Sequence, residues 1–181
     1  MRKNALLKSR YAIAAIAIGL VISQMTVMAK YDDDKEKQVS PTGVWLVNIV
    51  PRNCTTGVPI PNAAFESLWT FHKDGTMLVS VRNNVLTLER TAAHGLWRRD
   101  RGAGDDASDR DPRTYELKFV HLRRSVSTGA FAGKQESGGS LVLSNTGGEF
   151  TTDGFTIVYG VDGVPVGTPG CSNSYGTRFE L

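Results

Sequence analysis

Helical patterning is almost absent from this sequence of 181 residues. From Thr42 onward, no sustained stretch repeats apolar residues at the spacing of an amphipathic helix, which argues against a helical bundle. The sequence also lacks a Gly-x-Ser-x-Gly motif and a phosphate-binding loop, so it carries no signature of a serine hydrolase or of a nucleotide-using enzyme. The glutamates that could serve acid–base chemistry fall mostly on expected outward faces or in turns: Glu66, Glu89, Glu116, Glu136 and Glu149.

Long apolar runs are scarce as well, and the longest lies near the N-terminus. The chain begins with the basic segment MRKNALLKSR, followed by an apolar segment and by small residues that end at Ala29. This order is typical of a signal peptide over residues 1–29, with cleavage after Ala29. The uninterrupted apolar stretch 12–22 is shorter than the ~20 residues that a membrane-spanning helix needs. We therefore expect an exported protein, periplasmic or extracellular, that has no membrane attachment after cleavage.

An excess of positive charge is missing from the expected mature chain. The whole sequence has 21 Lys and Arg against 18 Asp and Glu, but four basic residues and no acidic residue precede position 30. Removing those four from 21 leaves 17 basic residues against 18 acidic ones, a balance that does not favour nucleic-acid binding. The stretch 30–41 holds many charges and little to bury, so we expect a flexible charged spacer before one domain over 42–181.

Cysteine is also rare, with only Cys54 and Cys171 in the sequence. Neither follows the expected cleavage point directly, so a lipid anchor is not expected. An even number of cysteines in an exported chain is most simply a disulfide. A catalytic thiol would need a nearby histidine, which the sequence does not indicate. Metal binding by two cysteines so far apart in sequence is a weaker alternative.

What the sequence does contain is a series of short alternating runs bounded by Gly, Asn, Asp or Pro. The runs that predict strands cover residues 43–50, 65–73, 76–82, 94–99, 114–123, 140–145, 155–161 and 177–181, with a further candidate within 126–136. Turns are predicted at Asp74-Gly75, Gly138-Gly139, Gly147-Gly148, Asp153-Gly154 and Asp162-Gly163. Eight or nine short strands joined by tight turns predict an all-β antiparallel barrel or sandwich.

One segment, 99–112, breaks this rhythm because it has no large apolar side chain, and we expect it to be a mobile loop. Its aspartates lack the alternate-position spacing and the terminal Glu of a calcium-binding loop. We therefore expect no metal at Asp105, Asp106, Asp109 and Asp111.

The run GVWLVNIV at 43–50 places Trp45, Val47 and Ile49 on one face, which we expect to point inward. Opposed residues in an antiparallel pair have position numbers with a constant sum. That sum is 225 for the two cysteines and 223 for Trp45 and Arg178, so a disulfide would bring the first strand against the last with these two side chains close together. A guanidinium over an indole gains on the order of 1 kcal/mol. The two strands would then close a barrel.

Gly43-x-Trp45, together with the arginine of GTRF at 176–179, resembles the signature of the lipocalin and wider calycin superfamily. The stretches PRNCTTGVPIP, LWTFHKDGT, HGLW and GCSNSYGTRFE are similar to those of exported bacterial lipocalin-like proteins, over residues 42–181. The resemblance implies a lipocalin-like barrel of about eight or nine strands in which Trp45 and Arg178 pack at the closed end. The insertion GDDASDRDP and the lack of a recognisable middle motif leave open an eight-stranded lipocalin or a related barrel.

Aromatic side chains are the best candidates for a ligand pocket. A barrel of about eight strands has room either to fill itself with side chains or to hold one small ligand. The pocket residues that we predict are Trp69, Phe71, Tyr115, Phe119 and His121.

The three histidines do not have the spacing of metal ligands, so we expect no metal and no cofactor. His72 is expected to face outward and His94 to lie at a strand end, whereas His121 shares an inward face with Phe119. Arg123 lies two residues further along that face. His121 and Arg123 could orient the carboxylate of a ligand, or they could belong to the solvated rim of the barrel.

These observations, with the resemblance, predict a monomeric exported barrel that binds a small apolar or amphipathic ligand in its interior. Some lipocalin-like barrels are isomerases or cyclases, so an enzyme with His121 as its candidate base is a second hypothesis. A third is a protein-binding module that uses the loops 51–64 and 99–113.

Overall fold

Nine strands make up the part of the chain that the computed structural model describes, residues 39–81, 88–100, 111 and 113–180. They are β1 (Gly43–Arg52), β2 (Phe65–Phe71), β3 (Thr76–Val81), β4 (Leu88–Arg90), β5 (Ala93–Arg99), β6 (Thr114–Ser125), β7 (Phe131–Leu143), β8 (Glu149–Tyr159) and β9 (Gly170–Arg178). Within these residues no helix is long and apolar enough to cross a membrane. The expected signal peptide and most of the expected spacer lie outside the described residues.

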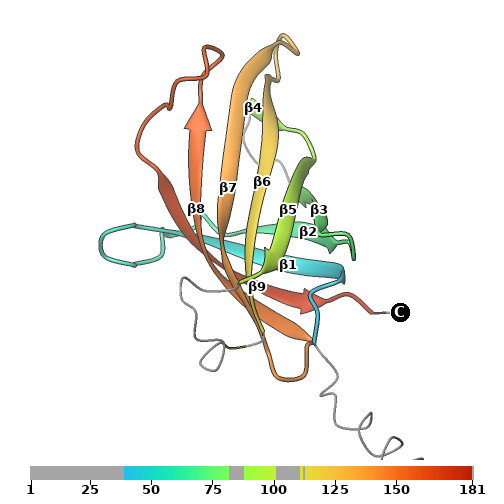
Figure 1. Cartoon of the computed structure of the whole chain (residues 1–181). Helices are drawn as coiled ribbons and strands as arrows, with labels where there is room; N and C mark the ends of the chain where they lie inside the picture. The colour runs from blue at the N-terminus through green and yellow to red at the C-terminus, as the bar shows by residue number, and fades with distance from the viewer. Residues whose placement is uncertain (1–38, 82–87, 101–110, 112, 181) are drawn as a thin grey trace, which may run out of the picture. The chain divides into compact units, whose positions relative to one another are not determined.

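The strands form one antiparallel sheet that closes on itself (Figure 1). Eight of them pair in the order β1-β2-β3-β5-β6-β7-β8-β9, and β9 pairs again with β1. The remaining strand, β4, pairs with β6 beyond the end of β5, so β4 and β5 lie end to end along the same side of β6. The predicted all-β antiparallel barrel is therefore confirmed, with one short strand in addition to the eight that close it.

The second half of the barrel has longer strands than the sequence predicts. The run 140–145 and the candidate within 126–136 both overlap one continuous strand, β7, and the run 177–181 covers only the end of β9. The short strand β4 was not among the predicted runs. Most of the expected loop 99–112, with Asp105, Asp106 and Asp109, lies outside the described residues.

Two of the five predicted turns are wrong, because Gly138-Gly139 lies inside β7 and Asp153-Gly154 lies inside β8. Gly139 and Gly154 are directly opposed across these two strands. A Cβ on Gly139 would collide with the carbonyl oxygen of Asp153. The glycines therefore let the backbones of two long strands approach closely. The other three pairs, Asp74-Gly75 among them, lie between strands as predicted.

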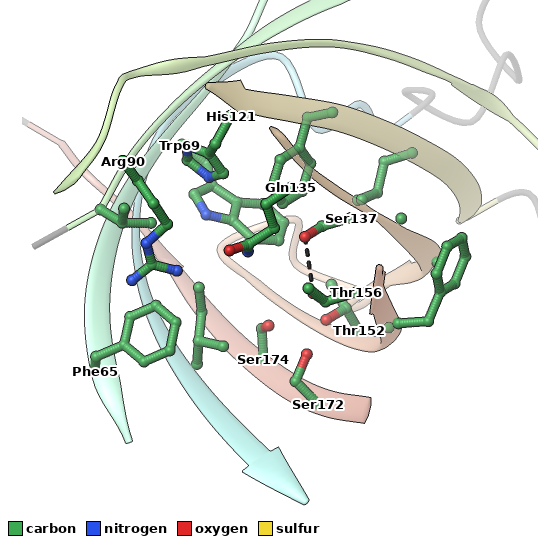
Figure 2. A pocket seen from close by; sticks show the side chains of 18 residues that line it. Phe65, Trp69, Arg90, His121, Gln135, Ser137, Thr152, Thr156, Ser172 and Ser174 are labelled. Atoms are coloured by element: carbon green, nitrogen blue, oxygen red, sulfur yellow. Dashed lines mark hydrogen bonds between the residues drawn. The ribbon is translucent and has the colours of Figure 1, made fainter. Parts of the chain in front are cut away.

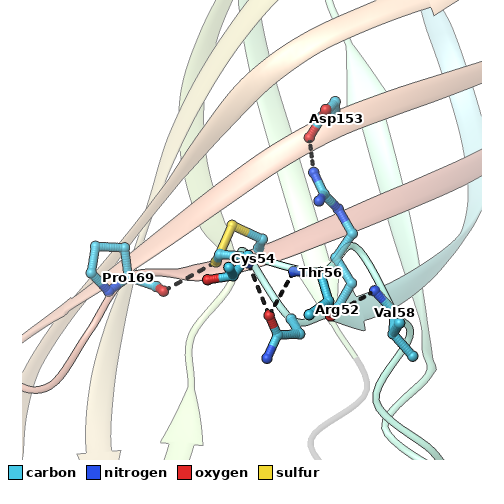
Figure 3. Close-up of a disulfide and its surroundings, with 9 residues drawn as sticks. Arg52, Cys54, Thr56, Val58, Asp153 and Pro169 are labelled. Atoms are coloured by element: carbon cyan, nitrogen blue, oxygen red, sulfur yellow. Dashed lines mark hydrogen bonds and ion pairs between the residues drawn. A yellow bond between two sulfur atoms is a disulfide. The ribbon is translucent and has the colours of Figure 1, made fainter.

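β1 and β9 join the two ends of the domain as antiparallel neighbours, as the sequence predicts. Trp45 is directly opposite Arg178. Cys54, which lies beyond the end of β1, forms a disulfide with Cys171, with the two Cα atoms 5.2 Å apart (Figure 3). Within the strands Cys171 pairs with Arg52 rather than with Cys54, which accounts for the two different sums of position numbers.

The closed end of the barrel is organised around Arg178. Its guanidinium carbon lies 4.4 Å from the centre of the Trp45 ring. Its three nitrogens donate hydrogen bonds to the carbonyl oxygens of Gly147 at 3.0 Å, Thr42 at 2.6 Å and Ser40 at 2.9 Å. One side chain thus ties together the start of the domain, the β7–β8 turn and the first strand.

The Gly-x-Trp motif follows from this arrangement. Gly43 has a φ of +133°, and a Cβ there would lie 2.7 Å from Nη1 of Arg178. Trp45 is fully buried, and its indole nitrogen donates to the carbonyl oxygen of Pro41 at 2.7 Å. Residues 39–41, which were expected to belong to the spacer, therefore pack on the barrel, and the domain begins at Val39.

Aromatic rings fill the half of the barrel next to this closed end. The Phe150 ring lies 4.8 Å from Trp45, 5.6 Å from Trp69 and 6.2 Å from Phe71, measured between ring centres. Phe71 in turn meets Trp97 edge to face at 6.0 Å. Rings at these separations attract one another through their edges and faces. Any room for a ligand must lie in the other half.

Candidate functional site

A cavity of about 50 Å³ occupies the half of the barrel away from Trp45 and Arg178 (Figure 2). Its lining residues lie from the middle of the strands to the ends that are joined by the disulfide. Ile49, Phe65 and Ser172, for example, all lie near that end of β1, β2 and β9. The cavity therefore opens at the end opposite the closed one.

Two unlike walls face each other across this cavity. Large apolar side chains come from β1, β2, β3 and β6, namely Ile49, Phe65, Trp69, Val81, Leu117 and Phe119. The inward positions of β7, β8 and β9 mostly carry small residues, namely Ser137, Gly139, Thr152, Gly154, Thr156, Ser172 and Ser174. The small side chains at these inward positions leave the hollow, and most of these residues bring a hydroxyl group.

The small-residue wall is polar even where it is deeply buried. Thr152 and Ser174 are directly opposed across β8 and β9 and are only 7% and 3% exposed. The hydroxyls of Ser137 and Thr156 are hydrogen-bonded to each other at 2.8 Å. Because polar groups away from bulk water need hydrogen-bond partners, this wall suits a water molecule or a polar part of a ligand.

His121 lines the cavity and is only 1% exposed. Its Nδ1 atom lies 2.7 Å from the carbonyl oxygen of Thr91, which can only accept, so Nδ1 carries the proton. Burial lowers the pKa of His121 below its ordinary value of 6.5, and the nearby charge of Arg90 lowers it further, while the hydrogen bond to Thr91 acts in the opposite direction. The neutral ring is therefore favoured, with Nε2 as an acceptor.

Thr91 marks the interruption between β4 and β5. Its backbone nitrogen donates to the carbonyl oxygen of Leu122 at 2.9 Å. Its hydroxyl, rather than its carbonyl, accepts the hydrogen bond of the Leu122 amide at 3.2 Å. This exchange frees the Thr91 carbonyl to turn inward to His121, so the histidine helps to hold β4 in place.

Arg90, at the end of β4, brings a positive charge to the cavity (Figure 2). Its guanidinium carbon lies 5.1 Å from the centre of the Phe65 ring. Burial lowers the pKa of Arg90, and the neighbouring charge of Arg123 lowers it further. Arg90 and Arg123 are directly opposed across β4 and β6.

The predicted pocket residues lie at two levels of the barrel. Trp69, Phe119 and His121 line the cavity. Phe71 and Tyr115 do not line it and lie in the filled half, where both rings pack against Trp97. The Tyr115 hydroxyl donates to the carbonyl oxygen of Val39 at 2.7 Å, which ties it to the start of the domain.

Sequence reasoning missed Arg90 and the polar wall. Arg90 was missed because β4 has only three residues and no alternating apolar pattern. Ser172 and Ser174 could have been found, because extending the sum of 223 along the chain places them opposite Pro51 and Ile49. The alternation of serines with other residues in that stretch then puts both on the inward face.

The other histidines take no part in this site, since His72 and His94 are exposed outside the barrel. Among the residues that the structure describes, no group of three His, Cys, Asp or Glu side chains could hold a metal ion.

Comparison with protein-family models gives no match for this chain, and a search of curated proteins gives none either.

Proposed function

We propose that this protein is an exported, lipocalin-like barrel that binds one small amphipathic molecule in the open half of its interior. The observation that carries the proposal is the cavity with an apolar wall on one side and a hydroxyl-bearing wall on the other. The closed antiparallel barrel and the packing of Arg178 on Trp45 are compatible with a lipocalin-like fold. The disulfide is consistent with export, because such bonds persist in oxidising compartments.

The size of the cavity limits what it can hold. Sites for drug-sized ligands usually have volumes of ~300–1,000 Å³, whereas this cavity has about 50 Å³. The ligand is therefore small, or only one end of it enters the barrel. Its apolar part would lie against Trp69 and Phe119, and its polar part would meet the hydroxyls of the opposite wall.

A filled cavity is the most direct test of this function. Ser174 is 3% exposed and lines the cavity, so Ser174→Leu would occupy the space that a ligand needs. Thr151→Leu is the matched control, because Thr151 lies on the outward face of the neighbouring strand β8. With hexanoate and hexanol as probes, we expect tryptophan fluorescence to report binding to the wild type and to Thr151→Leu, and binding weakened about tenfold or more in Ser174→Leu.

Two results would contradict the proposal: no response from the wild type to either probe, or equal affinities in the two variants. Thermal unfolding must accompany the titration, because an added side chain in a packed interior costs ~1–3 kcal/mol. Ser172→Leu, nearer the cavity mouth, gives a second filled variant should Ser174→Leu not fold. The enzyme and protein-binding hypotheses remain predictions, since no observation in the site favours either one.

A further inference from the structure

We infer that the ligand enters the barrel with an uncharged polar group first, and that its hydrocarbon chain leaves through the mouth along two apolar loops. This inference rests on the proposed function and adds the class and the orientation of the ligand. The ligand is a chain with a hydroxyl or amide group at one end. That group meets Thr152 and Ser174 inside the cavity, and the chain contacts the loops 53–64 and 160–169.

A pair of buried hydroxyl groups marks the place of the polar group. Thr152 and Ser174 are directly opposed across β8 and β9, line the cavity, and are 7% and 3% exposed (Figure 2). Within the residues that the structure describes, neither hydroxyl has a hydrogen-bond partner, whereas the hydroxyls of Ser137 and Thr156 satisfy each other. Because a buried hydroxyl is stabilised by a partner, the pair suits a ligand group that both donates and accepts.

The neighbours of this pair favour an uncharged polar group. The strand registers place Leu141 beside Thr152 and Ile49 beside Ser174 on the same inward face, and both neighbours are buried and apolar. The described residues that line the cavity include no aspartate or glutamate to pair with a cation. Arg90 already has interactions in the folded protein, so it is not a free partner for an anion. Burying an unpaired charge costs far more than burying an alcohol or an amide.

Two loops at the mouth share one construction. The loop 53–64 joins β1 to β2, and the loop 160–169 joins β8 to β9. Each contains Gly-Val-Pro followed by Ile or Val, at 57–60 and 163–166, and the glycine has a φ of +72° in the first and +79° in the second. In each loop the proline bridges to the last residue of the preceding strand. Two segments distant in sequence therefore have the same local structure.

These loops expose apolar side chains on a hydrogen-bonded backbone. The aliphatic residues that flank the two prolines are between 49% and 60% exposed, namely Val58, Ile60, Val164 and Val166. The residue after each proline donates its amide hydrogen bond to the preceding strand, at 2.9 Å for Ile60 and 2.7 Å for Val166. The two loops contain one charged residue, Asp162. They suit a hydrocarbon chain, because the contact removes apolar surface from water without stripping polar groups of their partners.

The disulfide joins the bases of the two loops (Figure 3). Cys54 belongs to the first loop, and Cys171 is the second residue of β9, just after the other loop. The Cys54 sulfur also lies 3.4 Å from the carbonyl oxygen of Pro169. Ile49 and Ser172, near the ends of the strands that carry these loops, line the cavity. A chain that leaves the cavity at this end therefore emerges beside both loops.

The experiment titrates three straight-chain probes, 1-hexanol, 1-decanol and hexanoate. Tryptophan fluorescence follows binding, because Trp69 lines the cavity. We expect hexanol to bind the wild type about tenfold more tightly than hexanoate, since the charge would be buried without a partner. Decanol should bind about tenfold more tightly than hexanol, because a fully buried methylene contributes about fourfold in affinity and a chain on the loops stays partly exposed.

Thr152→Val tests the place of the polar group, because valine removes the hydroxyl and keeps the size of the side chain. This variant should weaken hexanol binding about fivefold, the effect of one hydrogen bond. The matched control is Thr151→Val, the same exchange on the outward face of β8. It should leave hexanol affinity within about twofold of the wild type.

Ile60→Ser combined with Val166→Ser tests the path of the chain. It should reduce the advantage of decanol over hexanol to about threefold or less, and leave hexanol affinity within about twofold of the wild type. The matched control is Leu96→Ser, which removes an aliphatic side chain that is 67% exposed on β5 and should keep the advantage. Circular dichroism melting verifies folding, and Val58→Ser combined with Val164→Ser is a second loop variant.

The outcomes separate this inference from the proposed function. If decanol binds no more tightly than hexanol, or if the loop variants keep its advantage, the chain does not lie on the loops, although hexanol still binds in the cavity. If hexanoate binds as tightly as hexanol, or if Thr152→Val binds hexanol as Thr151→Val does, the uncharged inward group is wrong. If no probe binds, both the inference and the proposed function fail.

Discussion

Arg178 shows how much of the fold depends on single residues. It contacts an indole ring and three carbonyl oxygens from separate parts of the chain. Each hydrogen bond from a charged donor contributes ~1.5–3 kcal/mol when its loss leaves a partner unsatisfied. The residue lies at the end of the barrel opposite the cavity, so its role is structural rather than ligand-binding.

We predict that Arg178→Ala lowers the free energy of unfolding by about 2–4 kcal/mol. This is less than the sum of its three hydrogen bonds and its contact with Trp45, because such contributions are not additive. Arg178→Lys should recover only part of this, because an ammonium group cannot reach three carbonyl groups in the same plane. Urea unfolding measures the effect, and ligand affinity should be unchanged. The control is Arg98→Ala, since Arg98 forms an exposed ion pair with Glu116 and should cost less than about 1 kcal/mol. Equal losses in the two alanine variants would disprove the role assigned to Arg178.

His121 should make stability depend on pH. Because burial lowers its pKa in the folded protein, the unfolded chain binds more protons than the folded one below the ordinary pKa of 6.5. Stability is therefore fully present above pH 6.5 and falls as the pH drops toward the folded-state pKa, by at most about 1.4 kcal/mol per pH unit.

The measurement is urea unfolding between pH 7.5 and 5, comparing the wild type with His121→Gln. The slope of stability against pH should be smaller in the variant, since glutamine does not titrate. The acidic groups with lowered pKa values, Asp74, Asp111 and Glu136, titrate below this range and do not obscure it. Parallel profiles would show that the histidine is not held neutral.

Single residues also show what sequence can and cannot predict. The proximity of Trp45 and Arg178 was predictable to within about one residue pair, because a disulfide between the two cysteines makes the first and last strands antiparallel neighbours. The exact register was not predictable, since Cys54 lies beyond β1 and Cys171 pairs with Arg52. The inward orientation of His121 was predictable from alternation along one strand. Arg90 was not, because its position depends on how a three-residue strand continues past the end of β5.

At the scale of elements, the disulfide fastens the β1–β2 loop to the start of β9. Cys54 and Cys171 are separated by 117 residues, so their bond restricts a long segment of the unfolded chain. In the chain-entropy account a loop of ~100 residues corresponds to about 4–5 kcal/mol. We predict that Cys54→Ser with Cys171→Ser lowers the free energy of unfolding by about 3–5 kcal/mol.

Urea unfolding of the double variant measures this cost, and the reduced wild type should match it. Mass mapping of the exported protein without reductant should recover the two cysteines in one linked peptide pair. Free thiols at both positions in exported protein would remove the basis for the bond, and for the compartment inferred from it.

Glycine pairs explain where element prediction succeeded and failed. Asp74-Gly75 was read as a turn and lies in one, with Gly75 at a φ of +85°. Gly138-Gly139 was also read as a turn, yet it lies inside β7, where Gly139 approaches the backbone of β8 closely. The local sequence is equally suited to both, and only the opposing Gly154, which is distant in sequence, decides between them.

At the scale of the whole molecule, the barrel has a filled half and a hollow half. The filled half follows from large aromatic residues on facing strands at one level, such as Trp69, Phe71 and Phe150. The hollow half exists because, around the cavity, the inward positions of β7, β8 and β9 mostly carry small residues. Sequence alone predicted a barrel that could be filled or hollow, since the level of each residue depends on the registers of all eight strands.

Native mass spectrometry of the gently purified, exported protein tests the central claim most directly, with extraction and identification of any bound molecule. Wild-type protein and Thr151→Leu should carry the same small, amphipathic species, and Ser174→Leu should lack it. A wild type that carries nothing, or a Ser174→Leu protein that carries the same species as the wild type, would contradict ligand binding in the cavity.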